Sequence, residues 1–319
     1  MNESVTEDEK QVDHRLPAVL LAVYFVEGVL ISTSSFAICT AVCWHRALRK
    51  RKLLILIAGQ KLTDLVGGIS LLYAVAYQLA GALAGTANAA CVLAPSNLLF
   101  ALAVNWQYSI MLAVISIDRL LLVLTPMWHY SRDRCYPLTM IGVAYVGGLM
   151  LGLNSFYETT TTPDGQLPQR PLCHHAALSQ ATPSLRHLVF ATSLMFTSCA
   201  LFVPVFVLYL RRKTVVLPVR VAFVLVKEHP LLSMGVSTLC TFLFACVPHC
   251  IYMAAMHGAQ QQHTRDILVQ FVYALLNVNV ILNGIAYLRR HRELRVGFAA
   301  ILKRKQMPPT LRLWNTNAE

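Results

Sequence analysis

The chain has 319 residues, of which 56% are hydrophobic and only 13% are charged, and its mean hydropathy is +0.55. This composition leaves too much apolar surface for one soluble core, so it excludes an ordinary water-soluble globular domain and predicts a membrane protein. The formal net charge of +12 indicates contact with anionic membrane lipids, and the sequence gives no sign of nucleic-acid binding.

Apolar stretches long enough to cross the hydrocarbon layer, about 20 residues as a helix, occur seven times. In chain order they are Pro17–Trp44, Leu53–Ala80, Cys91–Leu124, Leu138–Tyr157, Leu185–Leu210, Leu231–Met256 and Ile267–Leu288. The further apolar run Val215–Val226 is about half the length needed to span and contains Pro218 and Arg220. We assign it to a loop and to the inner end of the sixth helix. The predicted fold class is therefore an all-α membrane protein, a seven-transmembrane helix bundle.

Lys and Arg residues cluster in the loops after the first, third and fifth spans and in the tail, whereas the other loops are nearly bare of them. Because basic residues are retained on the cytoplasmic side, the N-terminus is expected outside and the C-terminus inside. We expect a multi-pass protein of the plasma membrane, with an extracellular segment at 1–16, a seven-helix domain at 17–302 and a cytoplasmic tail at 303–319. The first 16 residues are polar, so the first helix is expected to act as the insertion signal.

Two local patterns predict how helices pack. After the seventh span, the segment Arg290–Leu302 places Leu294, Phe298, Ile301 and Leu302 on one face at helical spacing, which predicts a short amphipathic helix in the inner interface. The pairs Gly81 with Gly85 and Gly148 with Gly152 have the small-xxx-small spacing of closely packed membrane helices.

Two of the nine cysteines, Cys91 and Cys173, fall at the outer face; the others lie in spans or on the inner side, where disulfides are rare. We expect Cys91 and Cys173 to pair and to tie the second outer loop to the top of the third helix. Two unpaired thiols are the alternative. Asn2 begins a sequon on the outer side and is the candidate glycosylation site.

Asp118 and Arg119 stand together at the end of the third span, where an unpaired guanidinium would be costly. A carboxylate can hold the guanidinium in a resting state, and Glu228 at the inner end of the sixth helix is the candidate second acid. We assign Asn283 and Tyr287, at the end of the seventh span, to the same switch. The alternative, that Arg119 only reaches the headgroups, is disfavoured by the proline seven residues later.

Ionisable groups inside the membrane are expensive and are functional by default. Asp64 with Asn279 and Asn283 makes a candidate polar core, for which sodium is the candidate cation; a hydrogen-bonded structural carboxyl is the alternative. Lys61, one turn from Asp64, partly neutralises the carboxylate and weakens the sodium hypothesis. Glu27 either meets a cationic group of a ligand or pairs within the bundle.

These motifs together resemble the rhodopsin-like family of G-protein-coupled receptors, over essentially the whole chain. The matching residues are Leu62-Thr63-Asp64-Leu65, Asp118-Arg119-Leu120 followed by Pro126, Phe242 and Pro248, and Asn279 with Asn283 and Tyr287. Within the family, the strings Asn105-Trp106-Gln107 and Pro126-Met127-Trp128 are similar to nematode-type serpentine chemosensory receptors of the Srsx class.

The chain departs from the family pattern at several positions. The usual asparagine of the first helix is replaced near Ser34 or Ser35, the fourth helix lacks its usual tryptophan, and Gly284 stands where proline is expected. Cys246 stands where the family often has a tryptophan that responds to ligand, and Cys91 lies about one helical turn earlier than usual. These changes leave room for a receptor that couples weakly or differently.

The resemblance implies a ligand pocket between the third, fifth, sixth and seventh helices. Its candidate residues are Ala101, Asn105, Cys246, His249, Tyr252, Tyr273 and Asn277. Ala101 replaces the aspartate of amine receptors, which disfavours a biogenic amine. Asn277 replaces the lysine that holds retinal in opsins, so no retinal is expected. The mildly polar cavity suits a small organic molecule or a peptide end.

The expected function is a receptor that binds an extracellular small molecule or peptide and activates a heterotrimeric G protein through Asp118 and Arg119. We expect no catalytic residues, no metal centre and no resident cofactor, since the sequence has neither a Gly-x-Ser-x-Gly nor a His-Glu-x-x-His run. The alternative is a ligand-gated channel or transporter that uses Glu27, Lys61 and Asp64. It predicts inverted repeats, which the sequence does not display.

Overall fold

The computed structural model describes residues 7–84, 94–133, 135–161, 185–214, 230–258 and 262–302, and the regular structure in these ranges is entirely helical. The predicted loop at Val215–Val226 and the predicted tail at 303–319 lie outside the described residues.

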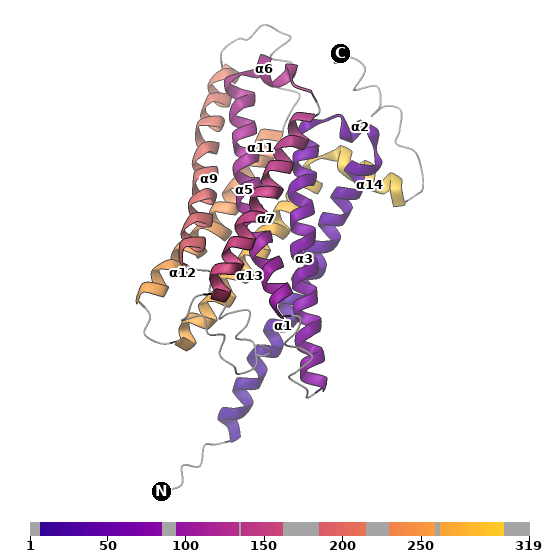
Figure 1. Ribbon diagram of the computed structural model, residues 1–319. Coiled ribbons are helices and arrows are strands. Elements are labelled where there is room, and N and C mark those ends of the chain that lie inside the picture. Colours follow the sequence, from indigo (N-terminus) through magenta and orange to yellow (C-terminus); the bar gives the residue numbers. More distant parts are fainter. Residues whose placement is uncertain are drawn as a thin grey trace.

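Seven long helical segments form an elongated bundle (Figure 1). They are α1 (Glu7–Trp44), α3 (Lys52–Ala84), α5 (Ala94–Leu124), α7 (Cys135–Thr161), α9 (Leu185–Thr214), the continuous run α11 (Pro230–Thr241), η2 (Phe242–Cys246) and α12 (Val247–Gly258), and α13 (Gln262–Arg290). Three short helices are α2 (Arg46–Arg49), α6 (Pro126–Ser131) and α14 (Arg292–Leu302). In Figure 1 these short helices lie at the upper end, which we call the α14 end, and α1 begins near the lower end.

The long helices have the length and the apolar character of membrane spans. Six of them each contain a stretch long and apolar enough to cross a membrane: Val19–Trp44, Lys52–Ala76, Leu102–Leu124, Cys135–Glu158, Val189–Leu208 and Gln270–Arg289. The seventh contains the shorter apolar stretch Ser237–Ile251 within the run α11–η2–α12. Large apolar side chains on the flanks face outward, such as Val143 (65% exposed) and Val203 (62% exposed), as lipid contact requires. The predicted fold class, an all-α seven-helix membrane bundle, is confirmed.

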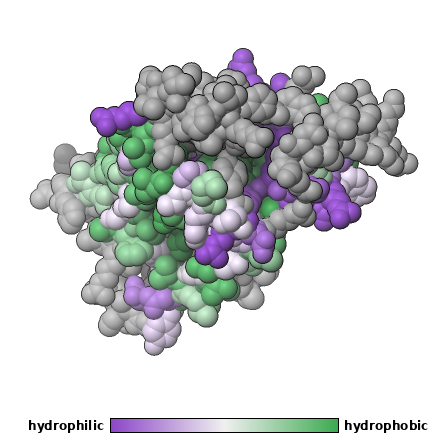
Figure 2. Space-filling view, turned by 90° about the horizontal axis from the view of Figure 1, so that it is seen from above, coloured by the Kyte–Doolittle hydropathy of each residue, from purple (hydrophilic) through white to green (hydrophobic). Residues whose placement is uncertain are grey.

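The α14 end presents both polar and apolar residues. Seen from above, hydrophilic residues in purple lie among hydrophobic residues in green (Figure 2).

The segment α11–η2–α12 is irregular next to its proline. Pro248 has no backbone N–H, and its ring would clash with the carbonyl four residues earlier in a regular α-helix. The preceding turn, Phe242–Cys246, is a π-helix, in which the N–H of Val247 donates to the carbonyl of Phe242. Such π-turns often mark functional bends in helices.

Helices α5 and α7 approach closely because α7 presents glycines to α5. A Cβ atom on Gly152 would lie 2.8 Å from Ala103 Cα, and one on Gly148 would lie 3.0 Å from Gln107 Cα. Close helix approach at Gly148 and Gly152 is therefore confirmed. The contacts of the other predicted pair, Gly81 and Gly85, lie outside the described part of the structure.

The amphipathic helix α14 docks onto α1, α2 and α3. Leu294 is fully buried in a cluster with Ile38, Leu54 and Tyr287. His45 Nε2 lies 2.9 Å from the carbonyl oxygen of Gly297. Arg51 Nη1 lies 3.0 Å from each carboxylate oxygen of Glu293. The short amphipathic helix predicted after the seventh span is thus present and is anchored on both its apolar and its polar side.

We predict that Gly152→Val destabilises the bundle, whereas Gly142→Val on the same helix does not. A side chain at position 152 would collide with the backbone of α5, which costs about 1–3 kcal/mol of overpacking, while a Cβ at position 142 meets nothing within 4 Å. Both substitutions make the same change in intrinsic helix propensity. Thermal unfolding of the purified protein in detergent measures the difference, and equal midpoints for the two variants would contradict the tight α5–α7 contact.

Candidate functional site

A buried ionic cluster lies at the α14 end of α5. Arg119 Nη2 donates to Asp118 Oδ2 at 2.5 Å, and His129 Nε2 from α6 lies 3.0 Å from Asp118 Oδ1. Arg119 is 2% exposed and Asp118 is fully buried. Because both carboxylate oxygens are engaged, the acid is held in one orientation against the guanidinium. The structure thus brings together the predicted neighbours Asp118 and Arg119, and it adds His129.

Helix α6 carries His129 to this cluster. It begins with Pro126, whose fixed φ angle suits the first turn of a helix. Lys52 Nζ of α3 donates to the carbonyl oxygen of His129 at 2.6 Å. The ring of Trp128 packs edge-on against Tyr136 of α7, with centroids 5.8 Å apart. These contacts hold α6 against α3 and α7, so His129 depends on three helices for its position.

The predicted second acid, Glu228, lies outside the described residues, so its contact with Arg119 stays a prediction. Among the described residues, Arg119 Nε has no hydrogen-bond partner. The guanidinium therefore keeps donor capacity toward a group that approaches from another helix.

A second buried ion pair lies in the middle of the bundle. Lys61 Nζ donates to Asp64 Oδ2 at 2.6 Å, and the two side chains are 0% and 2% exposed. The same ammonium lies 3.4 Å from the carbonyl oxygen of Val280 and 5.7 Å from the centroid of the Tyr287 ring. Lys61 thus joins α3 to α13, a role that its sequence position next to Asp64 did not reveal.

The asparagines of the predicted polar core make a hydrogen-bond chain along α13. Asn279 Nδ2 donates to Tyr108 Oη at 2.7 Å, and Asn283 Nδ2 donates to Asn279 Oδ1 at 3.3 Å. Ser237 Oγ donates to Asn283 Oδ1 at 2.8 Å and lies 3.4 Å from Tyr287 Oη. These hydrogen bonds therefore connect α5, α13 and α11, and they end at the predicted switch residue Tyr287.

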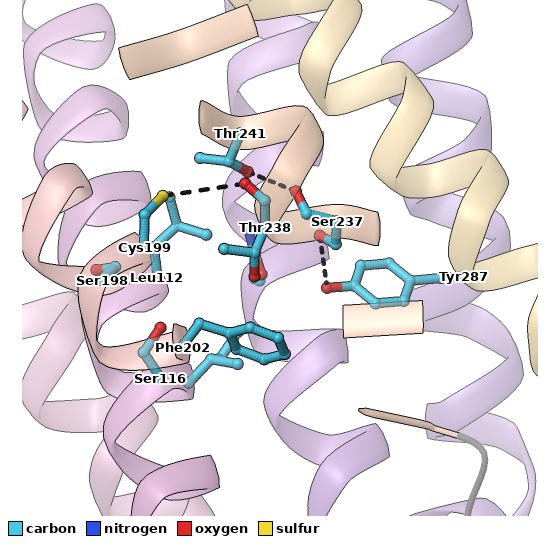
Figure 3. Close-up of a pocket in the computed structure, with 11 residues that line it drawn as sticks. Leu112, Ser116, Ser198, Cys199, Phe202, Ser237, Thr238, Thr241 and Tyr287 are labelled. Atoms are coloured by element: carbon cyan, nitrogen blue, oxygen red, sulfur yellow. Dashed lines mark hydrogen bonds between the residues drawn. The ribbon is translucent and has the colours of Figure 1, made fainter. Parts of the chain in front are cut away.

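A small cavity of about 30 Å³ lies beside this hydrogen-bond network. It is lined by Gln60, Leu112, Ile115, Ser116, Ser198, Cys199, Phe202, Ser237, Thr238, Thr241 and Tyr287. Figure 3 shows Ser237 and Tyr287 pointing toward each other, with Cys199 facing Thr238 from the neighbouring helix. Several hydroxyl groups face this space, so it suits water molecules that bridge α5, α9 and α11.

Two of the predicted ligand residues on the sixth segment are buried and contact the protein. Cys246 is fully buried, and its Sγ lies 4.0 Å from Cys199 Sγ of α9. His249 Nδ1 lies 2.9 Å from the carbonyl oxygen of Ala245, one turn earlier. The side chain of Tyr252 lies outside the described part of the structure.

The other predicted ligand residues differ in their surroundings. Asn277 Nδ2 donates to Glu27 Oε2 at 2.8 Å, so Glu27 pairs within the bundle, which was one of its two predicted roles. Tyr273 is exposed and Asn105 is half-buried. Ser109 Oγ donates to the carbonyl oxygen of Asn105 at 3.1 Å. The hydrogen bond from Asn277 to Glu27 therefore joins α13 to α1.

Three further predicted sites lie outside the described residues: Asn2, Cys91 and Cys173. The glycosylation and the disulfide stay predictions.

The chain matches a known protein family. A family model described as 7 transmembrane receptor (rhodopsin family) matches residues 34–287. The match begins in α1 and ends at Tyr287 of α13, so it includes the Lys61–Asp64 pair and the Asp118–Arg119–His129 cluster. No curated protein matches the chain.

We predict that Lys61→Met lowers the free energy of unfolding by about 3–5 kcal/mol, because it leaves the buried carboxylate of Asp64 without its ion-pair partner. Adding Asp64→Asn to this variant removes the uncompensated charge and restores most of the loss. Thermal unfolding of wild type, both single variants and the double variant in detergent makes up a double-mutant cycle. Additive losses in the double variant would contradict a coupled pair.

Proposed function

The chain belongs to the rhodopsin family of seven-transmembrane receptors, and from this we propose that it binds an extracellular small molecule or peptide and activates a heterotrimeric G protein. The observation that supports this proposal best is the buried Asp118–Arg119–His129 cluster at the α14 end. A guanidinium held by a neighbouring acid is a restrained charge, and a change in the helices around it can release that charge.

The moving element in this proposal is the segment α11–η2–α12. It carries the π-turn next to Pro248, and it borders the hydroxyl-lined cavity through Ser237, Thr238 and Thr241. A ligand that favours a shifted position of this segment stabilises that state by its difference in affinity for the two states. The shift would separate Glu228 from Arg119 and open an inner surface for the G protein.

The orientation and the binding site follow from the same proposal. The α14 end carries Arg46 and Arg49 on α2 and Arg295 on α14, so we assign it to the cytoplasm and to anionic lipid contact. The ligand would enter from the opposite face, beneath a loop tied by the Cys91–Cys173 disulfide. It would bind near Asn105, Cys246, His249, Tyr252, Tyr273 and Asn277.

The similarity to Srsx-type chemosensory receptors favours a small chemical cue as the ligand. The same reasoning assigns the protein to the plasma membrane, with residues 1–16 outside and residues 303–319 inside.

A channel or transporter is the second candidate, and the paired charges argue against it. Glu27 bonds to Asn277 and Lys61 bonds to Asp64, so each intramembrane charge that a conducting path would use contacts a partner in the bundle. Charges that are already paired between or within helices support a structural role in a receptor. Catalysis is not part of the proposal, because receptors of this family are not enzymes.

We predict that Arg119→Ala abolishes ligand-dependent guanine-nucleotide exchange and leaves surface expression intact. The ligand comes from a screen of odorants, metabolites and peptides on cells that express the protein. Arg49→Ala, which removes an exposed positive charge at the same end, serves as the control and keeps exchange. A ligand-dependent current without nucleotide exchange would overturn the receptor proposal in favour of the channel.

We also predict that Glu228→Ala raises basal nucleotide exchange, because it removes the second acid proposed to restrain Arg119. Asp133→Ala removes an exposed acid from the same end and is the matched control. Basal exchange is measured in membranes with added G protein at equal surface expression. An unchanged basal rate in Glu228→Ala would mean that this restraint does not form.

A further inference from the structure

The ammonium group of Lys61 lies among groups that bind monovalent cations. It donates to a carboxylate oxygen of Asp64 at 2.6 Å, lies 3.4 Å from the carbonyl oxygen of Val280, and faces the ring of Tyr287 at 5.7 Å from its centroid. A carboxylate, a backbone carbonyl and an aromatic face all carry negative charge or partial charge toward the ammonium. The group is thus surrounded much as a bound cation would be.

We propose that Lys61 is a built-in cation, which occupies the place beside Asp64 that a sodium ion would need and makes the folded receptor insensitive to sodium. A sodium ion that shared Asp64 would meet the full positive charge of Lys61 at close range in a medium of low dielectric constant. The buried pair also has no excess negative charge to offset a second cation. The donor set of this site therefore does not fit sodium.

The amide oxygens of the predicted polar core are also engaged. Asn279 Oδ1 accepts a hydrogen bond from Asn283, and Asn283 Oδ1 accepts one from Ser237. Among the described residues, Asp64 Oδ1 has no hydrogen-bond partner, but it belongs to a carboxylate already neutralised by Lys61. A hard cation requires several oxygen ligands at once, and the carboxylate and amide oxygens named here are, apart from Asp64 Oδ1, already engaged.

Gly284 of α13 lies beside Lys61 and Ser34. A Cβ atom at position 284 would lie 3.7 Å from Lys61 Nζ and 3.3 Å from Ser34 Oγ. A larger side chain there would extend into the space between α1, α3 and α13.

A tethered cation and a dissolved ion affect the stability of the folded protein differently. Lys61 cannot leave the bundle, so its link from Asp64 on α3 to Val280 and Tyr287 on α13 does not depend on salt concentration. An ion would instead stabilise the folded state in proportion to its concentration and affinity. Sodium dependence of stability therefore separates the two cases, and it does so without any ligand or G protein.

The test compares thermal unfolding of the full chain, purified in detergent, in sodium chloride and in choline chloride at equal ionic strength. Wild-type protein should have the same midpoint in both salts. Lys61→Ala should have a lower midpoint in choline and should regain several degrees in sodium, because its free carboxylate then accepts the ion. Lys61→Ala combined with Asp64→Asn is the control and should not respond to sodium.

Two results would overturn the proposal: a sodium-specific rise in the wild-type midpoint, or a Lys61→Ala variant that responds to sodium no more than wild type. If Lys61→Ala does not fold, Lys61→Ser takes its place, and the wild-type comparison still decides by itself. Because the readout is stability, a failure here leaves the proposed G-protein coupling untouched, and a failure of coupling leaves this inference untouched.

Discussion

Charges buried in a membrane bundle persist only when other groups of the protein satisfy them, because the hydrocarbon layer offers no water to do so. Three such arrangements organise this protein: Arg119 with Asp118 and His129, Lys61 with Asp64, and Glu27 with Asn277. The histidine comes from α6, the lysine also contacts α13, and Glu27 links α1 to α13. Satisfying the charges therefore fixes which helices are neighbours, as well as neutralising the groups themselves.

Helix α13 connects the central ion pair to the hydrogen-bond network around it. Its Tyr287 faces the ammonium of Lys61 and lies 3.4 Å from Ser237 Oγ of α11, while Asn279 and Asn283 extend the chain to Tyr108 of α5. A displacement of α11 would therefore disturb hydrogen bonds that reach several helices. The π-turn, which begins five residues after Ser237, is the place where the segment departs from regular helical geometry, so we expect the segment to bend there in the proposed movement.

Much of the candidate site was predictable where its residues are close in sequence. Lys61 and Asp64 are separated by one helical turn, so helix geometry alone places that pair within reach. Asp118 and Arg119 are adjacent at the end of a span, and their pairing was predicted from that position. His129, Tyr108 and Ser237 were missed. Tyr108 is 171 residues from its partner Asn279, and Ser237 is 46 residues from Asn283. No local pattern marks a tyrosine or a serine as the partner of a distant asparagine.

The sequence by itself determined the number and approximate positions of the membrane helices, the amphipathic α14 and the close glycine contacts at Gly148 and Gly152, because these follow from hydrophobic length, helical period and side-chain size. Only the tertiary structure decided that Lys61 reaches across to α13, that Asn277 bonds to Glu27, and that His129 completes the Asp118 cluster. The physical reason is that hydrogen bonds between helices depend closely on the relative rotation and depth of the two helices. Hydrophobic periodicity leaves both undetermined, since any rotation that buries the same apolar face satisfies it equally well.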